Sequence, residues 1–185
     1  GSGALDVWLS SYVAVSGLVA WSKPGDLSAA ASMAYIRRNR IALKSPLTKP
    51  VGEGFSSSNV ELRKRVDLYA YVRPAKSFPN TKSRFATGVD IITVRENTEG
   101  AYIGEGQSLS EDGETALLTQ KVTRRGSERI VRYAFDLARR TGRKQVTVVH
   151  KANILKSTSG LFLRTARVVA AEYPDIGCTE MIDDN

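Results

Sequence analysis

The stretch "GSERIVRYAFDLARRTGRKQVTVVH" (126–150) decides the fold, because a helix pattern passes into a strand pattern within it. Ser127 is a suitable N-cap, and Gly142 a suitable end, for a helix over 126–142. Apolar residues fall on one face of that helix: Ile130, Ala134, Leu137 and Ala138. The β-branched run at 145–150 then predicts a strand. A helix followed at once by a strand is typical of α/β proteins.

The rest of the chain continues this alternation. Further helices are expected at 28–39, 56–66 and 159–173. Further strands are expected at 40–47, 67–75, 89–95 and 177–182. We expect Pro74 to stop the second of these strands, and the third to be buried. The sequence therefore predicts an α/β fold with a largely parallel sheet.

The composition is that of an ordinary globular protein. The 185 residues are 42% hydrophobic and 25% charged, which suffices for one substantial core or two small ones. The nearly uncharged run at 4–21 contains Asp6 and is slightly short for a membrane span, so we expect core strands there. Cys178 is the single cysteine, which excludes an internal disulfide framework and fits a reducing compartment. Residues 1–3 resemble a tag remnant.

The net charge of +8 is consistent with three kinds of surface. The basic residues could bind nucleic acid, bind an acidic small molecule, or form a solvated surface whose acidic complement lies elsewhere. The cluster at 139–144 has a simple explanation, since cations are favourable at a helix C-terminus. The chain has no zinc-ligand spacing and no RNP-like run. We therefore expect neither a nucleic-acid partner nor a membrane partner.

Polar side chains gather where the strand at 89–95 ends. In "TVRENTEGAYIG" (93–104) these are Arg95, Glu96, Asn97, Glu99 and Tyr102. A loop that only had to turn could be built from Gly, Ser and Asp. Open α/β sheets bind their ligands at strand ends, so this segment is a candidate site.

Two further groups of polar residues stand at similar positions. Ser57, Asn59 and Arg63 share the first turns of an expected helix, where the positive dipole end suits a carboxylate or phosphate. Arg73 stands near the end of the following strand. Each arginine alone is more typical of a solvated surface. Together Arg63, Arg73 and Arg95 could clamp an acid with several carboxylates, because each planar guanidinium pairs bidentately.

The segment "VVHKANILK" (148–156) adds a fourth candidate. His150, the single histidine, is more typical of a satisfied buried residue than of a catalyst. Lys151 directly follows a strand, and a lysine near other cations can have its pKa lowered and then exchange protons. A structural role and a catalytic role for Lys151 both stay open at this point.

Three long blocks resemble the isocitrate dehydrogenases. They are "SSSNVELRKRVDLYAYVRPAK" (56–76), "VRENTEGAYIGEG" (94–106) and residues 121–176, which contain the opening stretch. This family belongs with the isopropylmalate and homoisocitrate dehydrogenases among the metal-dependent, decarboxylating β-hydroxyacid dehydrogenases. The likeness is detailed from about residue 36 to 182 and fainter over 5–35. It implies an enzyme that oxidises and decarboxylates isocitrate to 2-oxoglutarate, a step of the tricarboxylic acid cycle.

The resemblance also implies a domain organisation. Residues 4–88 would be part of the family's larger domain, carrying the substrate-binding helix and strand. Residues 89–185 would be the smaller α/β domain, through which subunits dimerise. A clasp at about 106–120 would pair with its counterpart in the neighbouring subunit. A homodimer is therefore expected.

In the substrate site, the resemblance gives Arg63, Arg73 and Arg95 the role of gripping the substrate carboxylates. Ser57 and Asn59 resemble the residues that contact the carboxylate peculiar to isocitrate. The isopropylmalate branch has an acidic and aliphatic stretch at these two positions. The resemblance thus favours isocitrate, or a similar polycarboxylate, as the ligand.

Other roles follow from the same resemblance. Tyr102 would deliver a proton after carbon dioxide leaves, and Lys151, acting in the neighbouring subunit, would help to remove the hydroxyl proton. Asn153 would face the nicotinamide of NAD or NADP. Asp184 resembles one of three aspartates that bind Mg²⁺ or Mn²⁺, while Asp183 departs from the family, which has an aliphatic residue there. Glu96, Asn97 and Glu99 would brace the loop.

The resemblance covers only part of the family's length. The first strand, two metal-binding aspartates and the adenosine-binding loop have no counterpart up to Asn185. We therefore expect a truncated form with little turnover alone, in the cytoplasm or the mitochondrial matrix. The alternative is a non-catalytic or engineered fragment retained for its fold, self-association or anion binding.

Overall fold

The computed structural model describes residues 30–41, 63–78, 80, 82, 84–85 and 87–184. The chain divides into two compact units, Gly1–Val66 and Asp67–Asn185. The predicted strands at 4–21, most of 40–47, and the candidate residues Ser57 and Asn59 lie outside the described residues. The domain boundary expected after residue 88 stays a prediction.

Within the first unit, the predicted helix at 28–39 is confirmed as α2 (Ala30–Asn39). It ends where Arg40 adopts a left-handed conformation (φ 55°) and donates its backbone N–H to the Ile36 carbonyl at 2.8 Å. Residues 63–65 form the helical end of the segment predicted at 56–66. In the part of the chain that the structure describes, no helix is long and apolar enough to cross a bilayer.

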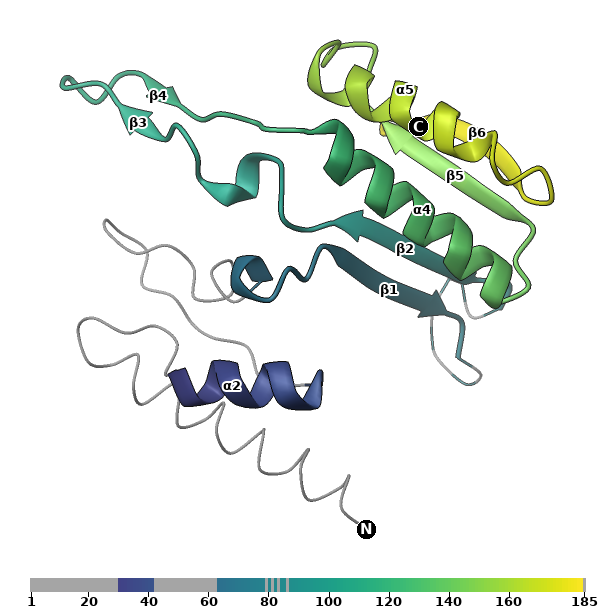
Figure 1. The fold of residues 1–185 in the computed structure, drawn as a ribbon. Helices are drawn as coiled ribbons and strands as arrows, with labels where there is room; N and C mark the ends of the chain where they lie inside the picture. The colour runs from purple at the N-terminus through teal and green to yellow at the C-terminus, as the bar shows by residue number, and fades with distance from the viewer. Residues whose placement is uncertain are drawn as a thin grey trace. The chain divides into compact units, whose positions relative to one another are not determined.

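The second unit contains two pairs of longer strands (Figure 1). β1 (Ala70–Lys76) and β2 (Asp90–Glu96) are antiparallel, with Ala70 opposite Glu96. β5 (Gln145–His150) and β6 (Gly177–Ile182) are parallel and confirm the predicted bounds. The α/β class is confirmed, but among the described strands the pairing is mixed rather than largely parallel.

Two corrections concern β1 and β2. β1 passes through Pro74, which lies opposite Ile92, rather than stopping there. Proline is tolerated because β1 is paired on one side only among the described strands. β2 is not a buried strand: residues on one of its faces are exposed, and Ile91 is 59% exposed.

The predicted helices after β2 are present with shifted starts. α4 spans Arg124–Arg140, and its N-cap is Thr123 rather than Ser127. The Ser127 hydroxyl lies inside the helix and donates to the Thr123 carbonyl at 2.8 Å. α5 spans Thr158–Ala170 and packs beside α4. Gly142 (φ 71°) closes α4 as expected, because glycine adopts this left-handed conformation without strain.

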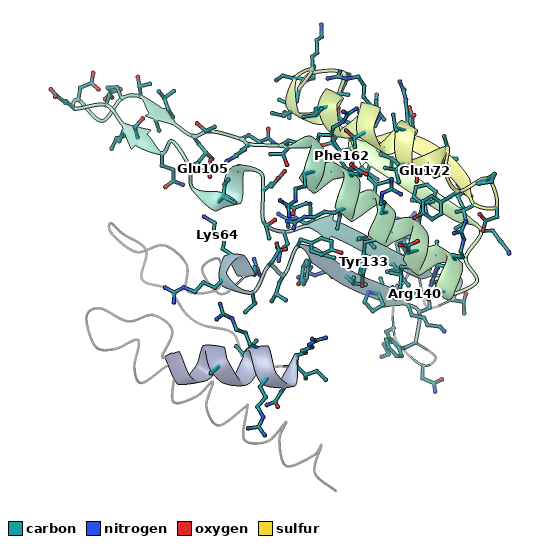
Figure 2. All side chains as sticks on the ribbon, viewed as in Figure 1. Lys64, Glu105, Tyr133, Arg140, Phe162 and Glu172 are labelled. Carbon is teal, nitrogen blue, oxygen red and sulfur yellow. The ribbon has the colours of Figure 1, made fainter. Side chains whose placement is uncertain are left out.

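The core lies between these helices and the strands. Phe135 of α4 is fully buried and stacks on Tyr173, with ring centroids 4.9 Å apart. Val148 of β5 and Val169 of α5 close the same cluster. On the β1 side, Tyr133 of α4 meets the Tyr69 ring edge to face at 6.1 Å (Figure 2). α4 is therefore the element that both strand pairs pack against.

The segment at 106–120 forms a hairpin within one chain. β3 (Ser108–Leu109) pairs with β4 (Ala116–Leu117), and the hairpin extends away from α4 (Figure 1). Leu109 and Leu117 are exposed on it, and so is Leu118. A hairpin of this length has little core of its own.

Replacing Phe135 by alanine tests the core. We expect Phe135→Ala to lower the free energy of unfolding by about 3–5 kcal/mol, because it leaves a cavity that α4 and α5 cannot close. Val168→Ala, on the exposed side of α5, is the matched control and should change it by less than about 0.5 kcal/mol. Urea unfolding followed by circular dichroism measures both. Equal losses in the two variants would contradict this core.

Candidate functional site

Two of the predicted clamp arginines share one face of the β1–β2 pair. Arg95 lies opposite Tyr71, and Arg73 lies opposite Thr93. Because side chains alternate along a strand, these four residues point to the same face. Arg73 and Arg95 are thus diagonal neighbours, a relation that places side-chain origins about 7–8 Å apart. Both are exposed, on the side away from α4.

Tyr71 holds the Arg73 side chain in place. The Nε of Arg73 donates to the Tyr71 hydroxyl at 2.7 Å, and its guanidinium carbon lies 4.8 Å from the ring centroid. An aromatic face attracts a cation, so Tyr71 holds the Arg73 guanidinium without forming an ion pair with it. Arg63 belongs to the first unit, so its part in the clamp stays a prediction.

The Glu96 carboxylate organises the turn that follows Arg95. It accepts the backbone N–H groups of Thr98 and Glu99, both at 2.7 Å, and the Thr98 hydroxyl at 2.6 Å. Asn97 donates its backbone N–H to the Tyr69 carbonyl at 2.9 Å. The Glu96 side chain is only 18% exposed. The predicted bracing by Glu96 and Asn97 is confirmed.

Glu99 connects this turn to the start of α4. Its carboxylate accepts the Thr123 backbone N–H at 2.8 Å and also the Thr123 hydroxyl. The same hydroxyl accepts the Gly126 N–H at 3.0 Å and so caps the helix. A carboxylate is stabilised at a helix N-terminus, so the cap and the predicted bracing by Glu99 support each other.

Tyr102 lies in the short 3₁₀ helix Ala101–Ile103, which follows the turn. A β-bridge between Gly100 and Lys121 fixes the backbone just before it. The position of the Tyr102 side chain is outside the described part of the structure, so its proton-transfer role stays a prediction.

Lys151 directly follows β5, as predicted, but its neighbours are carboxylates rather than cations. Its ammonium group donates to Asp184 and lies 3.5 Å from Asp183. The hydrogen bond from Lys151 to Asp184 raises the pKa of the lysine above its usual 10.5. The expectation of a lowered pKa is therefore wrong for this arrangement, because opposite charges favour the protonated form.

His150 and Asn153 flank Lys151. The Nδ1 of His150 accepts the Ala152 backbone N–H at 3.1 Å, which favours the structural role expected for this histidine. Asn153 is exposed in the turn after β5. Figure 1 shows the β2 and β5 arrowheads pointing toward the end of the unit at which α4 begins. Arg95 and Lys151 are thus both placed by strand carboxyl ends.

The described residues do not form a complete metal site. Among them, no group of three His, Cys, Asp or Glu side chains is placed to hold one ion. Asp183 and Asp184 offer carboxylate oxygens of the kind Mg²⁺ prefers, but Lys151 already pairs with Asp184. The described residues therefore supply only part of the donor set that a bound Mg²⁺ or Mn²⁺ needs.

A cavity of about 600 Å³ lies between β2, α4 and β5. Its lining is mostly apolar, with residues such as Ile92, Ile130 and Val148. It contains none of the predicted site residues. The candidate site is therefore an exposed strand face rather than this cavity.

Arg129 is a polar residue that the sequence did not single out. It projects from α4 to Asp67 before β1, to Glu96 at the end of β2, and to Thr98 in the turn that follows. In the sequence it is one more cation on an amphipathic helix. A separation of 62 residues from Asp67 gives no local signal of the contact.

Gly126 offers a test of the Glu99 cap. A Cβ at this position would lie 2.5 Å from the Glu99 carboxylate, so we expect Gly126→Ala to push Glu99 off the helix and lower stability by about 1–3 kcal/mol. Gly160→Ala in α5 is the control, since only the flexible end of Arg164 is near and alanine favours a helix by about 1 kcal/mol. Thermal unfolding compares them, and equal stability of the two variants would contradict the close packing at Gly126.

The comparisons with known proteins agree with this fold. A sequence model described as isocitrate/isopropylmalate dehydrogenase matches residues 9–185. An NAD isocitrate dehydrogenase catalytic subunit, mitochondrial, from Arabidopsis thaliana is 45% identical over 155 residues, covering 83% of this chain and 40% of that protein. A chloroplastic 3-isopropylmalate dehydrogenase from Solanum tuberosum is 44% identical, covering 83% of this chain and 42% of that protein.

A solved structure shows the same likeness. The crystal structure of isocitrate dehydrogenase from Methylococcus capsulatus superposes with a TM-score of 0.83 at 45% identity, covering 97% of this chain and 57% of that one. The chain spans about two fifths of the length of the first two relatives. With the family's sequence matched over most of the chain and its fold reproduced, the chain belongs to the isocitrate/isopropylmalate dehydrogenase family.

Proposed function

We propose that this chain carries the substrate-binding part of an NAD- or NADP-linked isocitrate dehydrogenase, in which Arg73 and Arg95 grip the carboxylates of isocitrate. The observation that supports this most strongly is the placement of both arginines on the open face of β1–β2. Neither is on the face that packs against α4, where a charged side chain would have to be paired.

The chemistry of the clamp follows from the guanidinium groups. Each is planar, stays charged at all ordinary pH values, and can donate two parallel hydrogen bonds to a carboxylate. A hydrogen bond to a charged group contributes about 1.5–3 kcal/mol, against about 0.2–1 kcal/mol for a simple exposed ion pair. Two adjacent arginines therefore favour a ligand with at least two carboxylates over a monocarboxylate.

Isocitrate is preferred over 3-isopropylmalate on the sequence argument from Ser57 and Asn59. Their hydroxyl and amide groups suit a third carboxylate, whereas 3-isopropylmalate carries an apolar branch there. Relatives with both names are almost equally similar to the chain, so overall identity does not decide between the substrates.

The pairing of Lys151 with Asp184 limits how this lysine can take part in proton transfer. Paired with Asp184, it is a protonated donor and not a base. It can accept a proton only after it has given one up, and the neighbouring carboxylates oppose that loss. The pair with Asp184 would therefore have to open, and Lys151 would have to release its proton, before it could help to remove the substrate hydroxyl proton in the neighbouring subunit, while Tyr102 would deliver a proton after carbon dioxide leaves.

NAD or NADP and Mg²⁺ or Mn²⁺ enter the proposal as the groups that the family uses. Asn153 and Asp184 would be this chain's contributions to their sites. Because the described donors do not complete a metal site, we expect ligand binding with little turnover from this chain alone.

Isothermal titration calorimetry with isocitrate tests the clamp directly. We expect Arg95→Gln to weaken isocitrate binding at least tenfold, which corresponds to about 1.4 kcal/mol for the lost bidentate pair. Arg140→Gln removes the same charge near the C-terminal end of α4 (Figure 2) and should leave the affinity unchanged.

Titration with 3-isopropylmalate on the same samples checks the substrate. The proposal predicts weaker binding than for isocitrate. Equal effects of the two arginine variants, or equal affinity for both ligands, would contradict it. Isocitrate binding with no reduction of NAD or NADP would favour the non-catalytic fragment over an active enzyme.

The hairpin supports a second proposal, a homodimer. Leu109, Leu117 and Leu118 are exposed apolar residues that pairing with a second hairpin would cover. Light scattering is expected to give twice the chain mass of 20.2 kDa. The double substitution Leu109→Lys and Leu117→Lys should shift the protein toward the monomer. Val168→Lys, on the exposed face of α5, is the control and should leave the mass unchanged if the dimer forms through the hairpin. A monomer at high concentration for the unsubstituted chain would rule out the dimer.

A further inference from the structure

Arg129 joins three segments at one end of the β1–β2 pair. Its Nη1 donates to both oxygens of Asp67, at 2.8 and 3.0 Å. Its Nη2 donates to Glu96 at 3.3 Å and also to the Thr98 hydroxyl. The guanidinium carbon lies 4.5 Å from the centroid of the Tyr69 ring. One side chain of α4 thus holds the segment before β1 and the turn after β2.

This end of the pair is the one that carries Arg95. Because the strands are antiparallel, the start of β1 lies beside the end of β2, where Ala70 is opposite Glu96 and Tyr71 is opposite Arg95. Glu96 points to the α4 side, and Arg95, as its neighbour, points to the open side. Whatever fixes the direction of Glu96 therefore also fixes the face on which Arg95 appears.

Contacts at both ends of the pair support the strand register. Thirteen residues, 77–89, connect β1 to β2, so no tight turn sets the register. At the loop end Ser77 holds the strands together: its backbone N–H donates to the Val89 carbonyl at 2.9 Å, and its hydroxyl accepts the Val89 N–H at 3.0 Å. At the other end, Arg129 crosses from Asp67 to Glu96. A slip of one residue there would turn Arg95 away from the face of Arg73.

A second arginine, in the turn between α4 and β5, holds β2 at its other end. Arg143 donates to the carbonyl of Asp90 at 2.9 Å and to its carboxylate. The two arginines use the same kind of contact on the same strand, at opposite ends. Substituting Arg143 is therefore the control, because it disturbs a contact to β2 at the end of the strand far from Arg95.

We propose that Arg129 is a positioning residue, which holds Arg95 on the carboxylate-binding face by anchoring Glu96, Thr98 and Asp67 to α4. The inference rests on the proposed substrate role of Arg95. The Arg129 guanidinium donates hydrogen bonds to Glu96, Thr98 and Asp67 at the same time. A lysine has the same charge but a single point of attachment, so Arg129→Lys keeps the charge and loses the geometry.

Nuclear magnetic resonance of the full chain labelled with ¹⁵N-arginine tests this without any ligand. The Arg95 Nε–H signal is assigned by its loss in Arg95→Gln. In Arg129→Lys we expect this signal to shift and its heteronuclear Overhauser effect to fall, because the strand end is released. In Arg143→Lys it should stay in place. An unchanged Arg95 signal in folded Arg129→Lys would overturn the proposal.

A milder variant covers the case in which Arg129→Lys fails to fold. Thr98→Val removes the hydroxyl that lies between Glu96 and Arg129 but leaves the Asp67 pair. We expect a smaller shift of the Arg95 signal in the same direction. No shift in folded Thr98→Val would then overturn the proposal.

Isocitrate titration of the same samples separates this inference from the proposed function. If the Arg95 signal of the unsubstituted chain does not respond to isocitrate, the substrate role fails, while the ligand-free spectra still decide whether Arg129 positions Arg95. If it responds, Arg129→Lys should weaken binding about tenfold and cause no further loss in the Arg95→Gln background. Additive losses in that double variant would overturn the positioning role, since a purely structural effect does not act through Arg95.

Discussion

The arrangement of the candidate site depends on the Glu96 carboxylate. It gathers two backbone N–H groups, a threonine hydroxyl and the Arg129 guanidinium at the point where β2 ends. A half-buried carboxylate is costly unless its oxygens are bonded in this way. These bonds fix the conformation of the turn after Arg95, and the turn brings Glu99 to the start of α4.

Several arginines form ion pairs with acidic residues of other segments of the chain. Arg132 pairs with Glu172, Arg139 with Asp175, and Arg167 with Glu180. In each pair the bond to the arginine lowers the pKa of the carboxyl. Arg139 and Arg143 of the cluster at 139–144 thus have acidic partners, Asp175 and Asp90, among the described residues. Arg73 differs, since among the described residues its partner is the Tyr71 phenol.

The sequence predicted the elements whose pattern is local. β5 and β6 have the expected bounds, and α4 differs by two residues, because β-branched runs and helical periodicity are properties of neighbouring residues. The N-cap of α4 was predicted at the wrong residue: Thr123 caps the helix, and its hydroxyl is also bound by the Glu99 carboxylate, 24 residues earlier. The continuation of β1 through Pro74 and the open face of β2 likewise depend on which strand lies beside which. Lys151 was placed correctly, but its pKa direction depends on Asp184 across the β5–β6 pair.

A crystal structure of the chain with isocitrate would show directly whether Arg73 and Arg95 bind the ligand. We expect ligand carboxylates within hydrogen-bond distance of the guanidinium groups of both Arg73 and Arg95, on the open face of β1–β2. Isocitrate bound at the 139–144 cluster instead, with that face empty, would contradict it.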